Sequence, residues 1–359
     1  MHNIGKQEFF SALLMGVVHT LFSIFVLLSS IWLCCALWIQ APFGWLISRI
    51  LIGVWIVFAC SILGIYAIDH FFSRRKDVLI YILAFLFSLL WYFGIPARSD
   101  RIWNPEVAHE LRYQRQGNIV TLSNVRNFDW HADGTATPHW ESRTLDLNQI
   151  TGVNIITSYW MGPQIAHTLV SFDFAQQKPL TFSIEIRKEQ HEDFSAIGGF
   201  FRKFELSLLA ADEKDIIYTR SNVRGEQVYF FPINMPKAEM KALFEEYLHK
   251  ADDLRQQPKW YNTFSSNCTT LVFDMVQAVS RKQLPSNYRL LASGYLPNYL
   301  YDLGALNPQW NMQTWYQKAH VNPRTQRFSQ FKYQNSENFS KVLRFGLPRS
   351  NPALAPHSL

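Results

Sequence analysis

The chain has 359 residues, of which 48% are hydrophobic and 17% are charged, and its formal net charge is +6. Nearly all of its long apolar runs lie before residue 98, which excludes an entirely water-soluble protein and predicts a membrane part followed by one substantial globular domain. Residues 318–359 hold seven basic residues and one acidic residue, so the rest of the chain is neutral.

Three apolar segments are long enough to cross a bilayer, namely residues 10–39, 50–68 and 78–95. Each approaches the roughly 20 residues that a membrane core requires. The first segment is far longer than the apolar part of a cleaved signal peptide, and two more segments follow it. We therefore predict that residues 1–97 form a transmembrane anchor of three helices. Arg49 is the one ionisable residue expected within the spans, which favours an anchor over a transport path.

The loop between the second and third segments contains Arg74, Arg75 and Lys76, and basic loops tend to be cytoplasmic. This position would place the soluble domain on the outer side. Arg98 and Arg101 argue for the opposite orientation, because they follow the third segment on the supposed outer side. Basic residues alone therefore leave the orientation open.

Residues 318–359 read as a basic C-terminal tail whose simplest partner is anionic lipid headgroups. Each basic side chain is worth about 1 kcal/mol near such a surface. Nucleic acid is the other common partner of basic segments, but no recognition motif accompanies the charge. A solvated, loosely ordered terminus is the alternative.

Residues 98–317 are predicted to form an α+β domain with a small antiparallel sheet, because short alternating runs are mixed with helical ones. Strands are expected at residues 118–122, 143–156, 166–174, 180–187 and 228–233, with a turn at Asp133-Gly134. Helices are expected at residues 192–211, 236–254 and 269–280.

The clearest element is a hairpin formed by residues 166–174 and 180–187. Polar and apolar residues alternate along both strands, so one face is apolar and the other carries His167 and Glu185. If Phe174 pairs with Leu180, then Glu185 lies diagonal to His167 and within reach of it.

Cys268 is the one cysteine of the soluble part, so this part cannot form an internal disulfide. The other three cysteines lie in the apolar segments: Cys34, Cys35 and Cys60. Ser266 or Asn267 is the expected N-cap of the helix at residues 269–280, which places Cys268 in its first turn. The N–H groups of a helix start favour a thiolate over a thiol, so Cys268 is a candidate nucleophile. A small buried residue is the alternative.

A thiolate at a helix start, beside a sheet that presents a histidine, is typical of papain-like cysteine enzymes. His167 is the candidate base and Glu185 the candidate orienting residue, with Asp173 and Asn267 as weaker candidates. The backbone N–H of Cys268 is expected to supply one oxyanion donor. Other histidines of the same domain stay open as alternatives: His131, His139 and His191. No metal and no cofactor is expected, because the chain has no ligand pair at metal spacing and no glycine-rich phosphate loop.

Four segments, in this order along the chain, resemble the DUF4105 family: residues 166–172 (AHTLVSF), 182–187 (FSIEIR), 201–205 (FRKFE) and 260–270 (WYNTFSSNCTT). This is the periplasmic domain of the type found in a bacterial lipoprotein N-acyltransferase that makes lyso-form lipoproteins. The resemblance covers about residues 118–300. It implies a periplasmic domain with a permuted papain-like (NlpC/P60-like) fold, in which catalytic His167 precedes catalytic Cys268. The family's acyltransferase carries its spans after this domain, whereas here they come first, which puts a shared substrate in question.

The leading hypothesis is a multi-pass protein of the bacterial inner membrane that acts as a thiol-dependent acyltransferase or hydrolase on lipoprotein or lipid acyl esters. A peptidase or amidase acting on peptidoglycan stem peptides is a second enzymatic hypothesis. A non-catalytic binding module of the cell envelope is a third.

Overall fold

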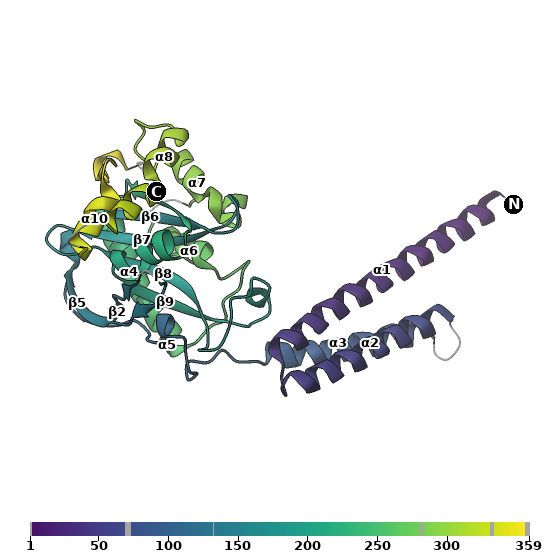
Figure 1. Cartoon of the computed structure of the whole chain (residues 1–359). Coiled ribbons are helices and arrows are strands. Elements are labelled where there is room, and N and C mark those ends of the chain that lie inside the picture. Colours follow the sequence, from purple (N-terminus) through teal and green to yellow (C-terminus); the bar gives the residue numbers. More distant parts are fainter. Residues whose placement is uncertain (1, 69–72, 132, 281–282, 331–333, 356–359) are drawn as a thin grey trace. The chain divides into compact units, whose positions relative to one another are not determined.

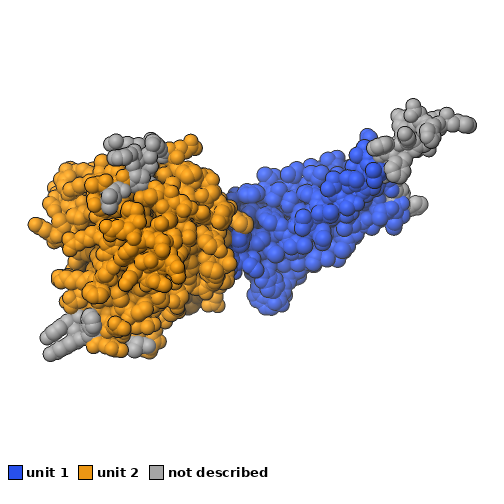
Figure 2. Space-filling model, turned by 90° about the horizontal axis from the view of Figure 1, so that it is seen from above, with its two compact units in different colours: residues 1–97, 195–203 blue, residues 98–194, 204–359 orange. Residues whose placement is uncertain are grey.

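The computed structural model describes residues 2–68, 73–131, 133–280, 283–330 and 334–355. The chain forms two compact units, which Figure 2 shows in different colours. Unit 1 is Met1–Ala97 together with Ser195–Lys203, and unit 2 is Arg98–Phe194 together with Phe204–Leu359. A short segment of the later sequence thus belongs with the N-terminal helices.

Unit 1 contains three long apolar helices: α1 (His2–Gln40), α2 (Trp45–Ile68) and α3 (Arg74–Phe93). Their spans Leu13–Gln40, Trp45–Ile68 and Arg74–Phe93 are long and apolar enough to cross a membrane. The three predicted apolar helices are therefore confirmed. Many of their large apolar side chains are exposed, as expected for a bundle that faces lipid rather than water.

Polar contacts join the helices of unit 1. The hydroxyl of Tyr81 on α3 lies 2.8 Å from the Ser29 hydroxyl and 3.0 Å from the Ser30 hydroxyl, both on α1. The expectation that Arg49 is the one ionisable residue of the spans is incomplete, because His19 lies within α1 and Asp77, which is fully buried, lies within α3.

The segment Ser195–Lys203 is tied to the ends of α1 and α3 by hydrogen bonds. Gln40 donates from its side-chain amide to two backbone carbonyls of this segment, at 2.6 and 2.8 Å. Arg202 donates to three backbone carbonyls at the end of α3, from Tyr92 to Ile95, at 3.1 to 3.2 Å. Because the last carbonyls of a helix lack intrahelical partners, this arginine caps α3.

Unit 2 is built around an eight-stranded sheet in the order β1-β2-β9-β8-β7-β6-β10, with β5 also paired to β2. The strands are β1 (Arg112–Gln116), β2 (Ile119–Arg126), β5 (Trp140–Asp146), β6 (Ile150–Tyr159), β7 (Ala166–Phe174), β8 (Leu180–Arg187), β9 (Glu205–Ala211) and β10 (Gln227–Ile233). All of these pairs are antiparallel except β2 with β9. The short strands β3 (Asp129–Trp130) and β4 (Ala136–Thr137) pair separately. The α+β class is confirmed, whereas the sheet is larger than expected.

Helices cover both faces of this sheet (Figure 1). One face packs against α5 (Lys237–Gln256), α6 (Cys268–Val279), α7 (Leu296–Asp302) and α8 (Met312–Ala319). The other face packs against α4 (Glu213–Tyr218), α9 (Asn322–Phe328) and α10 (Ser336–Arg344). Short turns complete the chain: η1 (Pro105–Val107), η2 (Leu147–Gln149), η3 (Gly198–Phe200), η4 (Thr219–Val223), η5 (Tyr288–Leu290), η6 (Ser293–Tyr295) and η7 (Pro352–Leu354).

The predicted helix over residues 192–211 is wrong. Its second half is the strand β9, which pairs with β8 along its whole length. Every residue of β9 is buried, the polar Glu205 and Ser207 included, and its last four residues form an apolar run without alternation. Periodicity alone cannot distinguish such a run from a buried helix.

The hairpin of β7 and β8 is confirmed with the predicted faces, but its register differs by two residues. Phe172 pairs with Leu180, where Phe174 was expected. A shift of two residues keeps every side chain on its own face of the sheet. With this register, His167 and Glu185 lie directly opposite each other across the two strands, whereas the predicted register placed them diagonally.

The described part of the basic C-terminal segment packs against the sheet as a folded part of unit 2. Its fully buried side chains include those of Phe328, Phe339 and Leu343. Arg344 donates to Asp173 of β7 at 3.0 Å and to Glu213 of α4 at 2.7 Å. Arg344 is therefore used inside the protein rather than presented to lipid headgroups.

Replacing Arg344 with Met should lower the free energy of unfolding by about 2–3 kcal/mol, because Glu213, only 1% exposed, loses its cation. The matched control is Lys341→Met on the same helix, whose pair with Glu337 is exposed and should contribute at most about 0.5 kcal/mol. Chemical denaturation monitored by circular dichroism measures both values. Equal effects of the two substitutions would contradict a structural role for this ion pair.

Candidate active site

The candidate site lies where two neighbouring strands of the sheet separate. The strands β7 and β8 pair only from Phe172↔Leu180 to Leu169↔Ser183, although β7 begins at Ala166 and β8 continues to Arg187. The strand β8 remains paired with β9 throughout this stretch. Side chains rather than a β-ladder therefore connect β7 and β8 at this end of the sheet.

Cys268 is the first residue of α6, as expected from its predicted cap. The side chain of Asn267 accepts hydrogen bonds from the backbone N–H groups of Thr269 and Thr270, both at 2.9 Å. The Thr270 hydroxyl accepts in return from the Asn267 N–H at 3.0 Å, which completes a capping box. The N–H of Cys268 itself has no hydrogen-bond partner among the described residues, so it remains available as a donor.

His167 and Glu185 meet in the space between the two strands. The Nε2 atom of His167 lies 3.2 Å from a carboxylate oxygen of Glu185 and 2.8 Å from the hydroxyl of Ser183. Ser183 donates to the same carboxylate at 2.6 Å. With Nε2 engaged in this way, Nδ1 is the ring nitrogen left for the thiol of Cys268.

Two further charges extend this arrangement beyond Glu185. Arg220, in the turn η4, donates to Glu185 at 2.6 Å and lies 3.4 Å from a carboxylate oxygen of Glu226. Glu226 also accepts a hydrogen bond from Ser158 on β6. All four charged side chains, His167 included, are at most 18% exposed, so their charges must compensate one another.

Cys268 and His167 shift each other's pKa toward the charged forms. Burial raises the pKa of the Cys268 thiol, but the His167 ring and the backbone N–H of Thr168 lower it by more, so the result is below 9.0. Burial and Arg220 lower the pKa of His167, whereas Glu185 and Cys268 raise it, and the result is about 9. These opposite shifts favour the pair of thiolate and imidazolium over the pair of thiol and neutral imidazole.

Glu185 is itself held in its charged form. Burial alone would raise the pKa of this carboxylate, but His167 and Arg220 hold it well below its ordinary value. A carboxylate that stays ionised fixes the ring of His167 and stabilises its positive charge. Glu185 therefore stands where an orienting residue is required.

Other polar groups surround the sulfur. The Thr269 hydroxyl lies 3.9 Å from the Cys268 sulfur and 3.0 Å from the Thr168 hydroxyl. Tyr247 is fully buried, and its hydroxyl has no hydrogen-bond partner among the described residues. Burial and the charge of Cys268 both raise the pKa of Tyr247. The Tyr247 phenol therefore stays neutral near Cys268.

The structure thus brings together Cys268, His167 and Glu185, and it places the weaker candidates elsewhere. Asp173 accepts from Arg344, and Asn267 serves as the helix cap. The alternative histidines that have described contacts are paired outside the site: His131 with Thr137, and His139 with Glu141. His191 is exposed.

Arg220, Glu226, Ser183 and Tyr247 were not assigned to the site from the sequence. Ser183 shares the polar face of the hairpin with the expected residues, so alternation gives a signal for it. The other three come from segments whose approach to the hairpin depends on tertiary packing.

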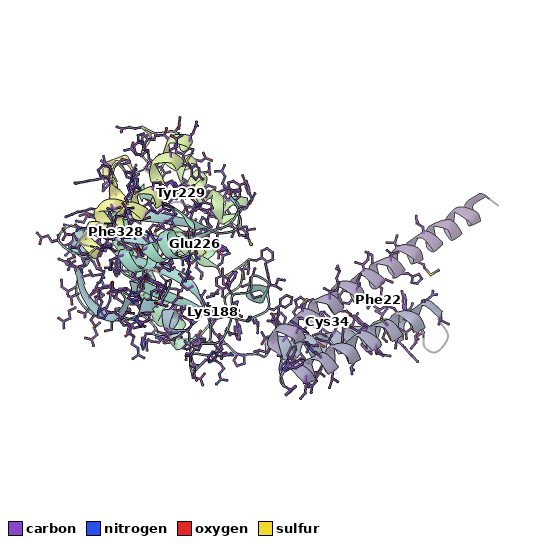
Figure 3. All side chains as sticks on the ribbon, viewed as in Figure 1. Phe22, Cys34, Lys188, Glu226, Tyr229 and Phe328 are labelled. Atoms are coloured by element: carbon purple, nitrogen blue, oxygen red, sulfur yellow. The ribbon has the colours of Figure 1, made fainter. Side chains whose placement is uncertain are left out.

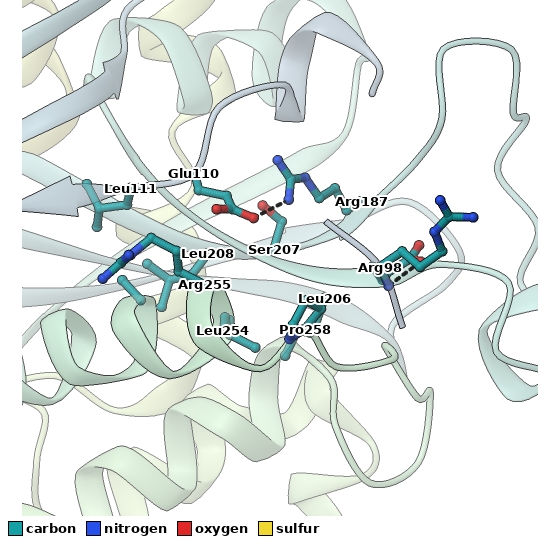
Figure 4. A pocket seen from close by; sticks show the side chains of 12 residues that line it. Arg98, Glu110, Leu111, Arg187, Leu206, Ser207, Leu208, Leu254, Arg255 and Pro258 are labelled. Carbon is teal, nitrogen blue, oxygen red and sulfur yellow. Dashed lines mark hydrogen bonds and ion pairs between the residues drawn. The ribbon is translucent and has the colours of Figure 1, made fainter. Parts of the chain in front are cut away.

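A small hollow near this region is too small to hold a substrate (Figure 4). Its volume is about 20 Å³, which is space for about one water molecule. Arg187 donates to Glu110 there at 2.6 Å, and the Arg98 backbone N–H donates to Glu205 at 3.1 Å. Cys268 is not among the twelve lining residues, of which six are apolar, so the hollow is not part of the candidate site.

Comparison with known protein families finds a match for part of the chain. Residues 136–294 match the family described as the Lnb N-terminal periplasmic domain. No curated protein and no solved structure matches the chain. The matched segment contains Cys268, His167 and Glu185, and it supports the expected family relationship at the level of this domain. The family match and the three apolar helices together indicate a membrane-anchored protein whose periplasmic domain is similar to that of the Lnb family.

Proposed function

We propose that this protein is a thiol-dependent acyltransferase or hydrolase, in which Cys268 is the nucleophile and His167 the base and acid. The single observation that carries the proposal is the buried pair of Cys268 and His167, whose pKa values are shifted toward thiolate and imidazolium at a helix start. Buried structural cysteines are ordinarily thiols, with a raised rather than a lowered pKa. Glu185 is the orienting residue of the proposal.

The proposed reaction has two steps. The thiolate of Cys268 attacks an acyl carbonyl, the sulfur–carbon bond forms, and the ester carbon–oxygen bond breaks while His167 gives its proton to the leaving oxygen. An amine or water then attacks the thioester, His167 takes the proton of the attacking group, and the sulfur–carbon bond breaks. The free N–H of Cys268 stabilises the negative oxygen in both steps.

The proposed substrates are lipoprotein or lipid acyl esters at the outer face of the bacterial inner membrane. Three membrane-length helices, which we propose to make the protein multi-pass, keep the domain close to such esters. The same chemistry cleaves an amide, and an imidazolium with a pKa of about 9 is suited to protonate an amine leaving group. A peptidase or amidase acting on cell-wall peptides is therefore the second candidate.

The nucleophile can be tested in a variant in which Cys34, Cys35 and Cys60 are replaced by Ala. Membranes containing this variant are treated with the para-nitrophenyl ester of a long-chain fatty acid, and peptides are analysed by mass spectrometry. We expect one acyl group on Cys268 and at least about a tenfold loss of labelling in His167→Ala, since that variant loses the base. A Cys268→Ala variant checks that no other residue reacts. Equal labelling of Cys268 with and without His167 would refute the proposed dyad. Cleavage of a stem peptide without ester labelling would favour the peptidase or amidase.

The pH dependence of alkylation by iodoacetamide tests the charge state of Cys268. The thiol pKa is lowered, so the thiolate and its reactivity should persist below the ordinary thiol pKa and disappear only as pH falls through the lowered value. In His167→Ala the thiol pKa should rise, and the rate at about pH 7 should fall about tenfold or more. A rate that rises in both proteins only near pH 9 would show that no ion pair forms.

The orienting role can be tested with Glu185→Gln, which keeps the shape of the side chain and removes its charge. The pKa of His167 should then fall below about 9, because Glu185 raises it. Nuclear magnetic resonance of labelled histidine measures this pKa directly. Glu246→Gln on α5 is the matched control, since its partner His249 lies outside the site. An unchanged His167 pKa in Glu185→Gln would exclude the orienting role.

A further inference from the structure

A groove of about 780 Å³ lies at the edge of the sheet, beside the first half of β10. Its volume falls within the range of about 300–1,000 Å³ that is usual for small-ligand sites. One wall is formed where two loops approach closely: a Cβ on Gly294 would lie 2.1 Å from the carbonyl oxygen of Pro163, so only glycine fits there. We propose that this groove binds a saccharide.

Aromatic residues are five of the thirteen that line the groove. The five aromatic lining residues are Tyr159, Trp160, Tyr229, Tyr295 and Tyr316. Tyr229 is central, because its ring centroid lies 5.4 Å from that of Tyr159 and 5.6 Å from that of Tyr316, both edge to face. Trp160 is 45% exposed at the rim. The face of an aromatic ring carries negative potential, so the polarised C–H groups of a pyranose ring can lie against it.

Planar polar side chains line the same groove. The Asn298 amide accepts from Tyr316 at 2.7 Å, and the Gln227 amide pairs with His320 at 2.9 Å. The N–H groups of both amides, and the hydroxyls of Tyr229 and Tyr295, have no hydrogen-bond partner among the described residues. A saccharide presents both hydroxyl groups for these donors and apolar ring faces for the aromatic side chains.

Two other classes of occupant fit this lining less well. An acyl chain would leave the free amide and hydroxyl groups without partners, at a cost in free energy for each one that is buried. An extended peptide would need the edge of β10, but the Val228 carbonyl already accepts from the Val321 N–H at 2.9 Å. The Val228 N–H donates to Asn322 at 2.8 Å, so this stretch of the edge is occupied.

The groove is connected to the candidate active site through its own lining. Glu226 lines the groove and pairs with Arg220, which contacts Glu185 (Figure 3 labels Glu226 and Tyr229). On the other side, Ser293 precedes Gly294 and hydrogen-bonds the backbone of Ala166, next to His167. A saccharide in the groove would therefore sit beside the site without occupying the thiol.

Calorimetric titration of the full chain tests the proposal, in a detergent whose headgroup contains no sugar. One arm adds the soluble tetramer of N-acetylglucosamine, and a second adds phosphatidylglycerol vesicles with and without a glucosyl diacylglycerol. These arms distinguish a glycan strand from a glycolipid headgroup. We expect saccharide binding that weakens about tenfold or more in Trp160→Ala and in Asn298→Ala, since both remove contacts to the ligand.

Two controls make the outcome decisive. Phe345→Ala removes an aromatic side chain that is 75% exposed and does not line the groove, so binding should be unchanged. Cys268→Ala should also bind like the unaltered protein, so a failure of the proposed chemistry leaves this test intact. Variants are compared only where their melting temperatures agree. The proposal is overturned if neither saccharide binds, or if the substitutions of Trp160 and Asn298 leave saccharide binding unchanged. It is also overturned if palmitate or a stem peptide binds in the groove instead.

Discussion

Four buried side chains of alternating charge determine how the candidate site is held: His167, Glu185, Arg220 and Glu226. They come from β7, from β8 and from the chain around η4, so one series of contacts fixes three segments. An isolated charge at such depth would cost several kcal/mol, whereas in this series each charge lies beside one of opposite sign. Removing any one of these side chains leaves a neighbouring charge without a partner. The position of the His167 ring therefore depends on residues that are distant in sequence.

This arrangement also explains how the sheet tolerates an opening in its middle. The ladder between β7 and β8 stops at Leu169 and Ser183, where sheet hydrogen bonds would otherwise continue. The contacts of His167 with Ser183 and Glu185 bridge the two strands there instead. The start of α6 packs against both strands, and it presents a sulfur to a ring that is already fixed. Rigid strands and a capped helix therefore set the geometry, rather than a loop.

Much of the site could be predicted from the sequence because its signals are local. A cap residue before an apolar helix places Cys268, and alternation places His167 and Glu185 on one face. The register could not be predicted, since a shift of two residues preserves that face. Arg220 carries no local signal, because its role arises only when η4 packs against the hairpin. The strand β9 was mistaken for a helix because it is buried on both faces and its last four residues are all apolar, so alternation is missing from that half of the strand.

The membership of Ser195–Lys203 in unit 1 has a consequence for how the protein can be divided. The chain leaves unit 2 after Phe194 and returns to it at Phe204, between two strands that are neighbours in the sheet. Cutting the gene after Ala97 therefore does not yield unit 2 alone, because the protein fragment still carries a segment whose partners are the ends of α1 and α3. A self-contained soluble domain needs a redesigned connection between β8 and β9. The two units are interleaved in sequence, so a single cut cannot separate them.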